Sequence, residues 1–172
     1  MRRSLVVAVL TALSSACATV PPAEPGASAV LRTATGAQVG TISAMPMHRG
    51  VHVKIAASGM LPGVHGVHIH AVGRCDAPDF ASAGGHWNPD ATKHGTMSTS
   101  GRGPGHAGDL ANLTIAADGR GTLDAHSPSG TFADMLDADG AAFVVHAAAD
   151  DLMTDPSGNS GARIACGVFT RN

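Results

Sequence analysis

Short hydrophobic runs that alternate with polar residues begin at Ser28 and are separated by Gly and Asp. Runs of this length, rich in β-branched residues, predict β-strands. We expect eight of them, at residues 28–35, 38–44, 51–57, 64–72, 113–116, 121–125, 142–146 and 162–169. Eight short strands and no helical periodicity predict an all-β sandwich or barrel.

Two segments between the predicted strands are too long to be plain turns, at residues 73–108 and 147–161. Loops of that length in a compact domain are usually functional or disordered. Both carry polar residues that could bind a metal. We therefore predict two long functional loops, ordered by metal and by a disulfide.

The composition fits one domain and excludes some partners. A chain of 172 residues, 44% hydrophobic and 14% charged, can bury one core but is short for two. Its 22 Gly and 10 Pro favour many turns. The net charge is −2, without a Lys/Arg run, and aromatic residues are scarce. These features argue against nucleic acid as a partner, because its phosphates and bases need cations and stacking side chains.

The N-terminus has the layout of a signal peptide, predicted at residues 1–16. Arg2 and Arg3 precede an apolar run at 5–13, which is too short to anchor the chain in a membrane. Small residues then lead to Cys17, as in a bacterial lipobox, so we predict that Cys17 is lipidated. Cleavage nearby without a lipid, for instance after Ala18, is the alternative. Either outcome predicts an exported, periplasmic protein, with membrane contact only through a lipid.

The three cysteines leave an odd one in an exported protein unless processing consumes it. Lipidation of Cys17 leaves Cys75 and Cys166, which an oxidising compartment would join in a disulfide. Chain-entropy reasoning gives such a long-loop bridge roughly 4 to 5 kcal/mol of stabilisation. Residues 17–27, rich in Pro and Ala, are predicted to be the lipidated cysteine and a flexible tether, followed by the domain at 28–172.

Histidine is the unusual component: there are ten, and eight lie between His65 and His146. Strand periodicity places His68 and His70 on one face, where both imidazoles could reach the same ion. An H-x-H pair alone is weak evidence, but further histidines occur in and after both long segments. Neutral imidazoles suit copper and zinc, and a histidine set with one carboxylate suits zinc.

Six motifs strengthen this prediction by their order along the chain. They are HGVHIH, SAGGHWNP, KHG, HAGDL, VVHAAADDL and SGNSGARIACGV. Through them the domain, from about residue 28 to the C-terminus, resembles the copper,zinc superoxide dismutases. The resemblance implies an eight-stranded Greek-key β-sandwich or barrel. It also implies an enzyme with copper and zinc ions that converts superoxide into oxygen and hydrogen peroxide.

The resemblance also implies roles for individual residues. The two metal sites share His86, which bridges copper and zinc as an imidazolate and carries a proton during catalysis. Asp150 hydrogen-bonds a histidine of each site, Arg163 attracts the anionic substrate, and His65 braces loops. The copper ligands are His68, His70, His86 and His146, and the zinc ligands are His86, His94, His106 and Asp109.

Two rival functions and two open questions accompany this hypothesis. A copper-storage or copper-delivery lipoprotein on the same fold predicts a missing ligand or arginine, and this chain has neither gap. A non-catalytic domain that binds zinc only for stability would need neither the H-x-H pair nor Arg163. Whether the protein is a monomer or a homodimer stays open. His48 and His52, near two methionines, are interpreted as exposed edge residues, with capture of Cu(I) as the alternative.

Overall fold

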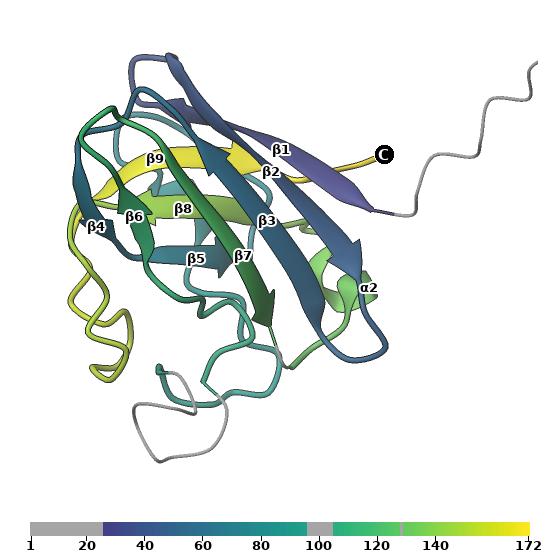
Figure 1. Cartoon of the computed structure of the whole chain (residues 1–172). Helices are drawn as coiled ribbons and strands as arrows, with labels where there is room; N and C mark the ends of the chain where they lie inside the picture. Colours follow the sequence, from purple (N-terminus) through teal and green to yellow (C-terminus); the bar gives the residue numbers. More distant parts are fainter. Residues whose placement is uncertain (1–25, 96–104, 128) are drawn as a thin grey trace, which may run out of the picture.

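The computed structural model describes residues 26–95, 105–127 and 129–172 (Figure 1). The predicted signal peptide at 1–16, the lipidation site Cys17 and nearly all of the tether lie outside the described residues. Ala27, which we assigned to the tether, instead begins the first strand. None of the helices in the described part is long and apolar enough to cross a membrane.

The described residues form ten strands, and every predicted strand region overlaps at least one of them. They are β1 (Ala27–Thr33), β2 (Gln38–Pro46), β3 (Val51–Ala57), β4 (Gly63–His65), β5 (Val67–His70), β6 (Leu113–Ile115), β7 (Gly121–Ser127), β8 (Ala142–His146), β9 (Arg163–Val168) and β10 (Thr170–Arg171). The prediction of an all-β architecture is confirmed, while the predicted count of eight is too low.

The extra strands have simple physical causes. The predicted strand at 64–72 is broken at Gly66 into β4 and β5. Gly66 instead bonds the backbone at and just after the end of β8, donating to the Ala148 carbonyl at 2.8 Å and accepting from the His146 amide at 2.8 Å. A Cβ at this position would lie 2.8 Å from the Ser160 side chain, so only glycine permits this approach. The two-residue β10 is too short for any periodic signal.

Eight strands form a curled antiparallel sheet in the order β5-β8-β9-β1-β2-β3-β7, with β10 paired to β1, and β4 and β6 form a separate pair. Within it, β9-β1-β2-β3 has the spatial order of a Greek key, since β1, β2 and β3 are consecutive hairpin strands and β9 returns beside β1. The return is fixed by pairing of Arg32 with Cys166. The sheet thus curls into the barrel seen in Figure 1.

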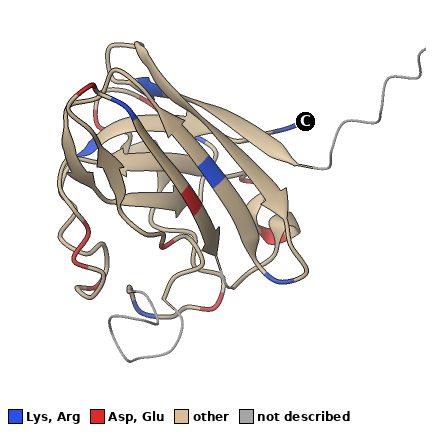
Figure 2. Ribbon diagram, in the orientation of Figure 1, with Lys and Arg blue, Asp and Glu red and all other residues tan. Residues whose placement is uncertain are grey.

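Alternation along the strands separates core from surface. In β3, Val51, Val53 and Ile55 are buried, while Lys54 between them is exposed. Phe143 of β8 and Leu31 of β1 are fully buried. Burying apolar surface is the main favourable term in folding, so this interior holds the strands in register. Charged residues are sparse on the strands, whereas the segment at residues 147–162 carries acidic residues and no Lys or Arg (Figure 2).

Two irregular segments extend from the same end of the barrel in Figure 1, at residues 71–112 and 147–162. The first contains the 3-10 helix η1 (Ala81–Ala83) and includes residues outside the described part. A third connection holds the short helix α2 (Phe132–Met135), which the sequence did not predict. The Thr131 hydroxyl caps α2 by accepting from the Asp134 amide at 3.1 Å.

Candidate metal centre

Strands β5 and β8 supply three of the predicted ligands at the edge of the sheet. His68 and His70 stand on β5, which pairs only with β8 in the main sheet, and His146 ends β8. The side chains of His68, His70 and His146 are at most 3% exposed. Because the loops cover this side of the sheet, the H-x-H pair faces the interior instead of solvent.

One nitrogen from each of four histidines converges on a common point. The ligand atoms of His68, His70, His86 and His146 all lie within 4.8 Å of one another. The nitrogens His68 Nδ1, His70 Nε2, His86 Nε2 and His146 Nε2 are buried and have no hydrogen-bond partner among the described residues. A buried polar atom without a partner costs about 1–3 kcal/mol. Four such atoms together therefore fit a bound cation.

The second nitrogen of three of these rings is held by an oxygen. His70 Nδ1 donates to the Gly84 carbonyl at 2.9 Å, and His146 Nδ1 donates to the Gly161 carbonyl at 3.0 Å. His68 Nε2 donates to Asp150 Oδ2 at 2.6 Å. Each bond fixes the tautomer that leaves the inward nitrogen with a free lone pair.

Burial keeps these three rings neutral. It lowers the pKa of His68 to about 3, of His70 to about 2 and of His146 to about 4, since the charged imidazolium is poorly solvated there. The positive charge of Arg163 lowers the pKa of His70 and His146 further. A neutral imidazole is the form that binds a metal.

A second group of atoms surrounds the carboxylate of Asp109. Its Oδ1 lies 2.8 Å from His86 Nδ1, 3.1 Å from His94 Nδ1 and 3.2 Å from His106 Nδ1. The His86 and His106 Nδ1 atoms are 3.3 Å apart. Zinc ligands about 2.0–2.1 Å from the metal in a tetrahedron are separated by about 3.3 Å. Three imidazole nitrogens thus lie around one carboxylate oxygen, which is a donor set that suits zinc.

His68 also lies near this second group, since its ligand atom is within 4.8 Å of those of His86, His94 and Asp109. His106 fits the group better, because its Nδ1 is 3.2 Å from Asp109 Oδ1 and 3.3 Å from His86 Nδ1. His68 Nε2 is already hydrogen-bonded to Asp150. His106 therefore has a nitrogen free to join His86, His94 and Asp109, whereas His68 presents its other nitrogen to the first histidine group.

Ionisation on this side differs from that around β5 and β8. Burial opposes the charge of Asp109, but hydrogen bonds from His106, His86 and His94 outweigh it and hold the pKa of this carboxyl well below its usual range. Burial likewise lowers the pKa of His94, but bonds to Asp109 and Asp150 raise it to about 9. Without metal, His94 is therefore protonated at neutral pH.

Asp150 joins the two groups, as predicted. Its Oδ2 accepts from His68 Nε2 at 2.6 Å and its Oδ1 accepts from His94 Nε2 at 3.0 Å. Hydrogen bonds to His68, His94 and the Leu152 amide outweigh burial and lower its pKa. One ionised carboxylate thus orients a ring of each group.

Sequence reasoning missed the residues that hold Asp150. The Asn112 side chain bonds both the amide and the carbonyl of Asp150, at 2.8 and 2.9 Å. Gly158 packs directly on the carboxylate, where a Cβ would overlap it. Asn112 lies outside the six motifs and gave no signal, whereas Gly158 lies inside the last of them.

Asp155 was also missed. Its carboxylate accepts from the His94 amide at 2.9 Å and lies 3.9 Å from His106 Nε2. It therefore connects the segment at 147–162 to the backbone of a predicted zinc ligand. Nothing in its sequence context distinguishes it from an ordinary loop acid.

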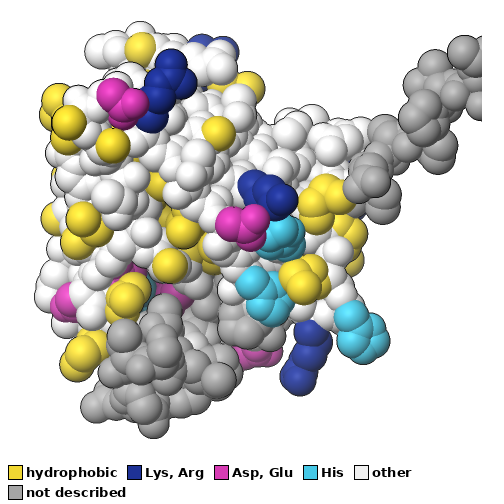
Figure 3. All heavy atoms as spheres, viewed as in Figure 1, with side chains coloured by type: hydrophobic (Ala, Val, Ile, Leu, Met, Phe, Trp, Pro, Cys, Tyr) yellow, Lys and Arg dark blue, Asp and Glu magenta, His cyan; other side chains and the backbone are white. Residues whose placement is uncertain are grey.

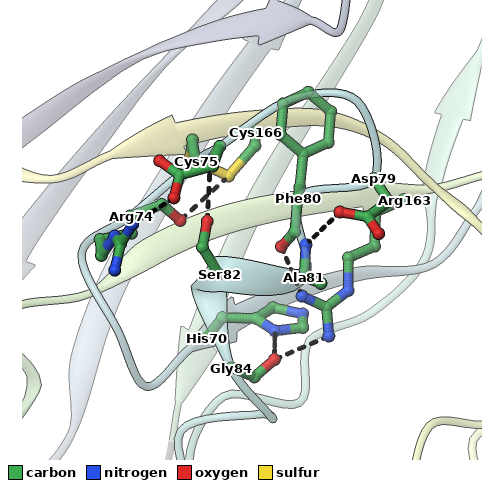
Figure 4. The surroundings of a disulfide bond; sticks show 11 residues. His70, Arg74, Cys75, Asp79, Phe80, Ala81, Ser82, Gly84, Arg163 and Cys166 are labelled. Carbon is green, nitrogen blue, oxygen red and sulfur yellow. Dashed lines mark hydrogen bonds and ion pairs between the residues drawn. A yellow bond between two sulfur atoms is a disulfide. The ribbon is translucent and has the colours of Figure 1, made fainter.

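The predicted disulfide between Cys75 and Cys166 is confirmed, and Arg163 lies close to it (Figure 4). The Arg163 guanidinium donates to the carbonyls of Phe80 at 2.6 Å and Gly84 at 2.7 Å. The Gly84 carbonyl also accepts from His70 Nδ1. A single backbone oxygen thus connects Arg163 to a ring of the first histidine group.

The remaining histidines lie outside both groups. His65 braces loops as predicted, since its ring nitrogens lie 2.8 Å from the His146 carbonyl and 3.2 Å from the Leu61 carbonyl. His48 is exposed in the turn after β2. The interpretation of His52 as an edge residue is wrong, because β3 pairs with both β2 and β7.

Three comparisons place the chain among known proteins. A model of the family "Copper/zinc superoxide dismutase (SODC)" matches residues 38–169. The chain is 40% identical to a "Superoxide dismutase [Cu-Zn]" of Caulobacter vibrioides, over 83% of this chain and 84% of that protein. It is 38% identical to the "Superoxide dismutase-like protein YojM" of Bacillus subtilis, over 100% and 98%. A crystal structure of a SOD-like protein from Bacillus subtilis superposes with a TM-score of 0.76 at 39% identity, covering 85% of this chain and 99% of that one.

Proposed function

Since the chain belongs to the copper/zinc superoxide dismutase family, we propose that its two histidine groups are the copper and zinc sites of the enzyme. The enzyme converts two superoxide anions and two protons into oxygen and hydrogen peroxide, with copper and zinc as cofactors. The open question is which side chains of this chain perform each part of that reaction.

The copper site consists of His68, His70, His86 and His146. The observation that carries this assignment is the set of four buried, unpartnered nitrogens that face one another. All four donors are imidazoles, a set that suits copper. The zinc site consists of His86, His94, His106 and Asp109, because three imidazoles gathered around one carboxylate suit zinc.

When bound, copper supplies one-electron redox chemistry, and zinc supplies a fixed charge that holds its ligands in place. His86 belongs to both groups: its Nδ1 faces Asp109, and its Nε2 faces the copper-site nitrogens. A proton held at Nε2 lies beside the site where the product forms. His86 is therefore the proposed proton carrier.

Arg163 is the proposed receptor for the superoxide anion. Its two carbonyl contacts hold the guanidinium beside His70 (Figure 4). Its charge is close enough to lower the pKa of both His70 and His146. A fixed cation here raises the local concentration of a small anion. The three residues that follow His146 are alanines, so they add no positive charge that could attract superoxide in place of Arg163.

The test is metal analysis together with superoxide consumption. Protein loaded with copper and zinc is expected to consume superoxide, and His146→Ala is expected to lose copper and activity while keeping zinc. Normal consumption by His146→Ala, or by protein freed of copper, would overturn the assignment. A storage or delivery protein, the rival hypothesis, would bind copper without consuming superoxide.

Arg163→Ala tests the anion receptor separately. We expect consumption of superoxide to fall by about tenfold or more, since electrostatic attraction contributes about 10- to 1,000-fold to such rates. Copper and zinc content should stay unchanged, and Arg163→Lys should restore part of the rate. An unchanged rate in Arg163→Ala would show that another group attracts the substrate.

We further propose that the protein is exported to the periplasm and carries a lipid on Cys17. The support is the order of Arg2 and Arg3, the apolar run at 5–13 and the small residues before Cys17. The experiment is fractionation of cells that express the full chain. Cys17→Ser should move the protein from the membrane to the soluble fraction. An equal distribution of both forms would favour simple cleavage without a lipid.

A further inference from the structure

The short helix η1 is flanked by the two backbone carbonyls that hold Arg163. Phe80 precedes the helix and Gly84 follows it. The Arg163 guanidinium donates to the Phe80 carbonyl at 2.6 Å and to the Gly84 carbonyl at 2.7 Å. Both flanking residues have positive φ, 56° for Phe80 and 74° for Gly84. These two backbone conformations direct both carbonyls to one guanidinium (Figure 4).

Phenylalanine is an unusual residue for this conformation. With φ of 56° and ψ of 24°, Phe80 lies in the left-handed region, where the Cβ atom crowds the following carbonyl oxygen. Gly84 meets the requirement for positive φ without a side chain. A bulky residue persists in such a conformation only where its surroundings hold it, and such positions concentrate at functional sites.

The surroundings that hold Phe80 are apolar. Phe80 is 3% exposed and belongs to a small buried cluster that is separate from the main core. The other members of the cluster are Ala83, Ala142, Val144 and Cys166, with the half-buried Cys75 packed against them. Ala142 and Val144 lie on β8, and Cys166 lies on β9. The Phe80 ring therefore joins the loop to these two strands, beside the disulfide.

Burial of this ring reflects specific packing. Single hydrophobic side chains stay exposed elsewhere, such as Leu61 at 81%, and Figure 3 shows such side chains scattered over one face of the molecule. An exposed hydrophobic side chain is thus tolerated in this protein. Residues 76–79 are exposed, and Phe80 alone turns inward from this stretch. Its amide also donates to the Asp76 carbonyl at 3.0 Å, which fixes the backbone before the ring.

We propose that Phe80 is a positioning residue for the anion receptor: its buried ring fixes the loop so that its own carbonyl holds the Arg163 guanidinium beside His70. The inference rests on the proposed role of Arg163 in attracting superoxide. Phe80 acts only through Arg163. Without the ring, the carbonyl moves away and one of the two charge-assisted hydrogen bonds of the guanidinium is lost.

The test compares variants of Phe80 in protein loaded with copper and zinc. Phe80→Gly removes the ring and adopts positive φ freely, whereas Phe80→Leu keeps an apolar side chain at the same position. We expect Phe80→Gly to consume superoxide about tenfold more slowly and with a weaker dependence on salt, because electrostatic attraction contributes at least about this much. Phe80→Leu should keep most of the native rate. Phe80→Ala, which removes the ring but restricts the backbone more than glycine, should behave as Phe80→Gly does.

NMR of the reduced, metal-loaded protein provides a readout that needs no activity. The side-chain N–H protons of Arg163 should exchange slowly with water in the native protein, since two carbonyls accept from them. Exchange should stay slow in Phe80→Leu and become faster in Phe80→Gly. Copper content, zinc content and the disulfide should stay native in both variants, because the main core does not include Phe80.

A double variant separates positioning from a general structural effect. In the Arg163→Ala protein, Phe80→Gly should slow the reaction no further, because residues that act as one unit have effects that do not add. Phe132→Ala is the matched control, since it removes a half-buried phenyl ring packed against the main core. It should leave the rate, its salt dependence and the Arg163 signals unchanged.

Four results would overturn the inference. They are a native rate in Phe80→Gly, an equal loss of rate in Phe80→Leu, additive slowing in the double variant, and slow exchange of the Arg163 protons in Phe80→Gly. A native rate in Arg163→Ala would instead refute the receptor assignment itself. In that case the exchange of the Arg163 protons would still show whether Phe80 holds the guanidinium.

Discussion

The two halves of the metal centre are built in different ways. The proposed copper ligands His68, His70 and His146 stand on β5 and β8, and the barrel's pairing fixes their backbone. On the zinc side, His94 and His106 lie in the irregular segment at 71–112. Strand pairing positions the first set before any metal arrives, whereas the second relies on loop contacts through Asp109, Asp150 and Asp155. The copper side should thus be the better organised half of the metal-free protein.

Proton binding shows the same contrast. On the copper side, burial lowers the pKa of His68, His70 and His146 to about 3, 2 and 4, so these rings are neutral and ready to bind. On the zinc side, Asp109 and Asp150 raise the pKa of His94 to about 9, so that ring holds a proton that zinc must displace. Zinc binding should therefore release a proton where copper binding does not.

The largest effect should come from removing the negative charge of Asp109, whose Oδ1 lies near all three zinc-side imidazoles. Asp109→Asn takes away the charge around which His86, His94 and His106 gather. We expect zinc to be lost from the purified protein while copper remains, as measured by metal analysis. Asp118→Asn, in an exposed turn, is the matched control. Zinc retained at full occupancy in Asp109→Asn would mean that the three imidazoles hold zinc without this carboxylate.

A titration of metal-free protein should separate the two halves by pH. The copper-side histidines have folded pKa values below the unfolded value of about 6.5, so the unfolded chain binds more protons and stability falls as the pH drops below 6.5. His94 has a folded pKa of about 9, so its contribution is complete below 6.5 and is lost as the pH rises to 9. The free energy of unfolding, from urea titrations, should peak near pH 6.5. A monotonic rise from pH 5 to 9 would contradict this.

Loss of the disulfide should cost stability and disturb the copper side. Cys75 and Cys166 are 91 residues apart, and closing so long a loop stabilises the fold by about 4 to 5 kcal/mol. The double variant C75S/C166S should show this loss in urea unfolding. Superoxide consumption should also fall, because the disulfide segment presents the Gly84 carbonyl to Arg163 and His70. Unchanged activity would show that these contacts hold without the bridge.

Asp150→Asn should weaken both sides together, since each carboxylate oxygen orients a ring of a different group. Loss of such a partner costs about 10–100-fold in metal affinity. Competition with chelators should show comparable decreases for copper and zinc. A decrease confined to one metal would show that Asp150 serves only that side.

The smallest effect should follow Asp155→Asn, which weakens one hydrogen bond to the His94 amide. Since hydrogen bonds to charged groups contribute about 1.5–3 kcal/mol, zinc affinity should fall by about tenfold. Copper affinity should stay unchanged, and Asp151→Asn, which removes an acid bonded only within the same loop, should affect neither metal. Equal effects of both variants would point to general loosening of the loop.

The sequence by itself determined the strands, the disulfide and the residue types of the metal centre. Alternation of apolar and polar residues reports directly which positions face a core, so β2, β3 and β8 were predicted almost to the residue. His68 and His70 were predicted to share a face because strand periodicity requires it.

Tertiary structure alone decided how the loop residues meet. Asn112 and Asp150 are 38 residues apart, and Asp155 bonds the backbone of a residue 61 positions away. No local pattern encodes such contacts, because they depend on where two irregular segments fold over the barrel. Periodicity fixes which way a side chain points, and only the fold fixes what it meets.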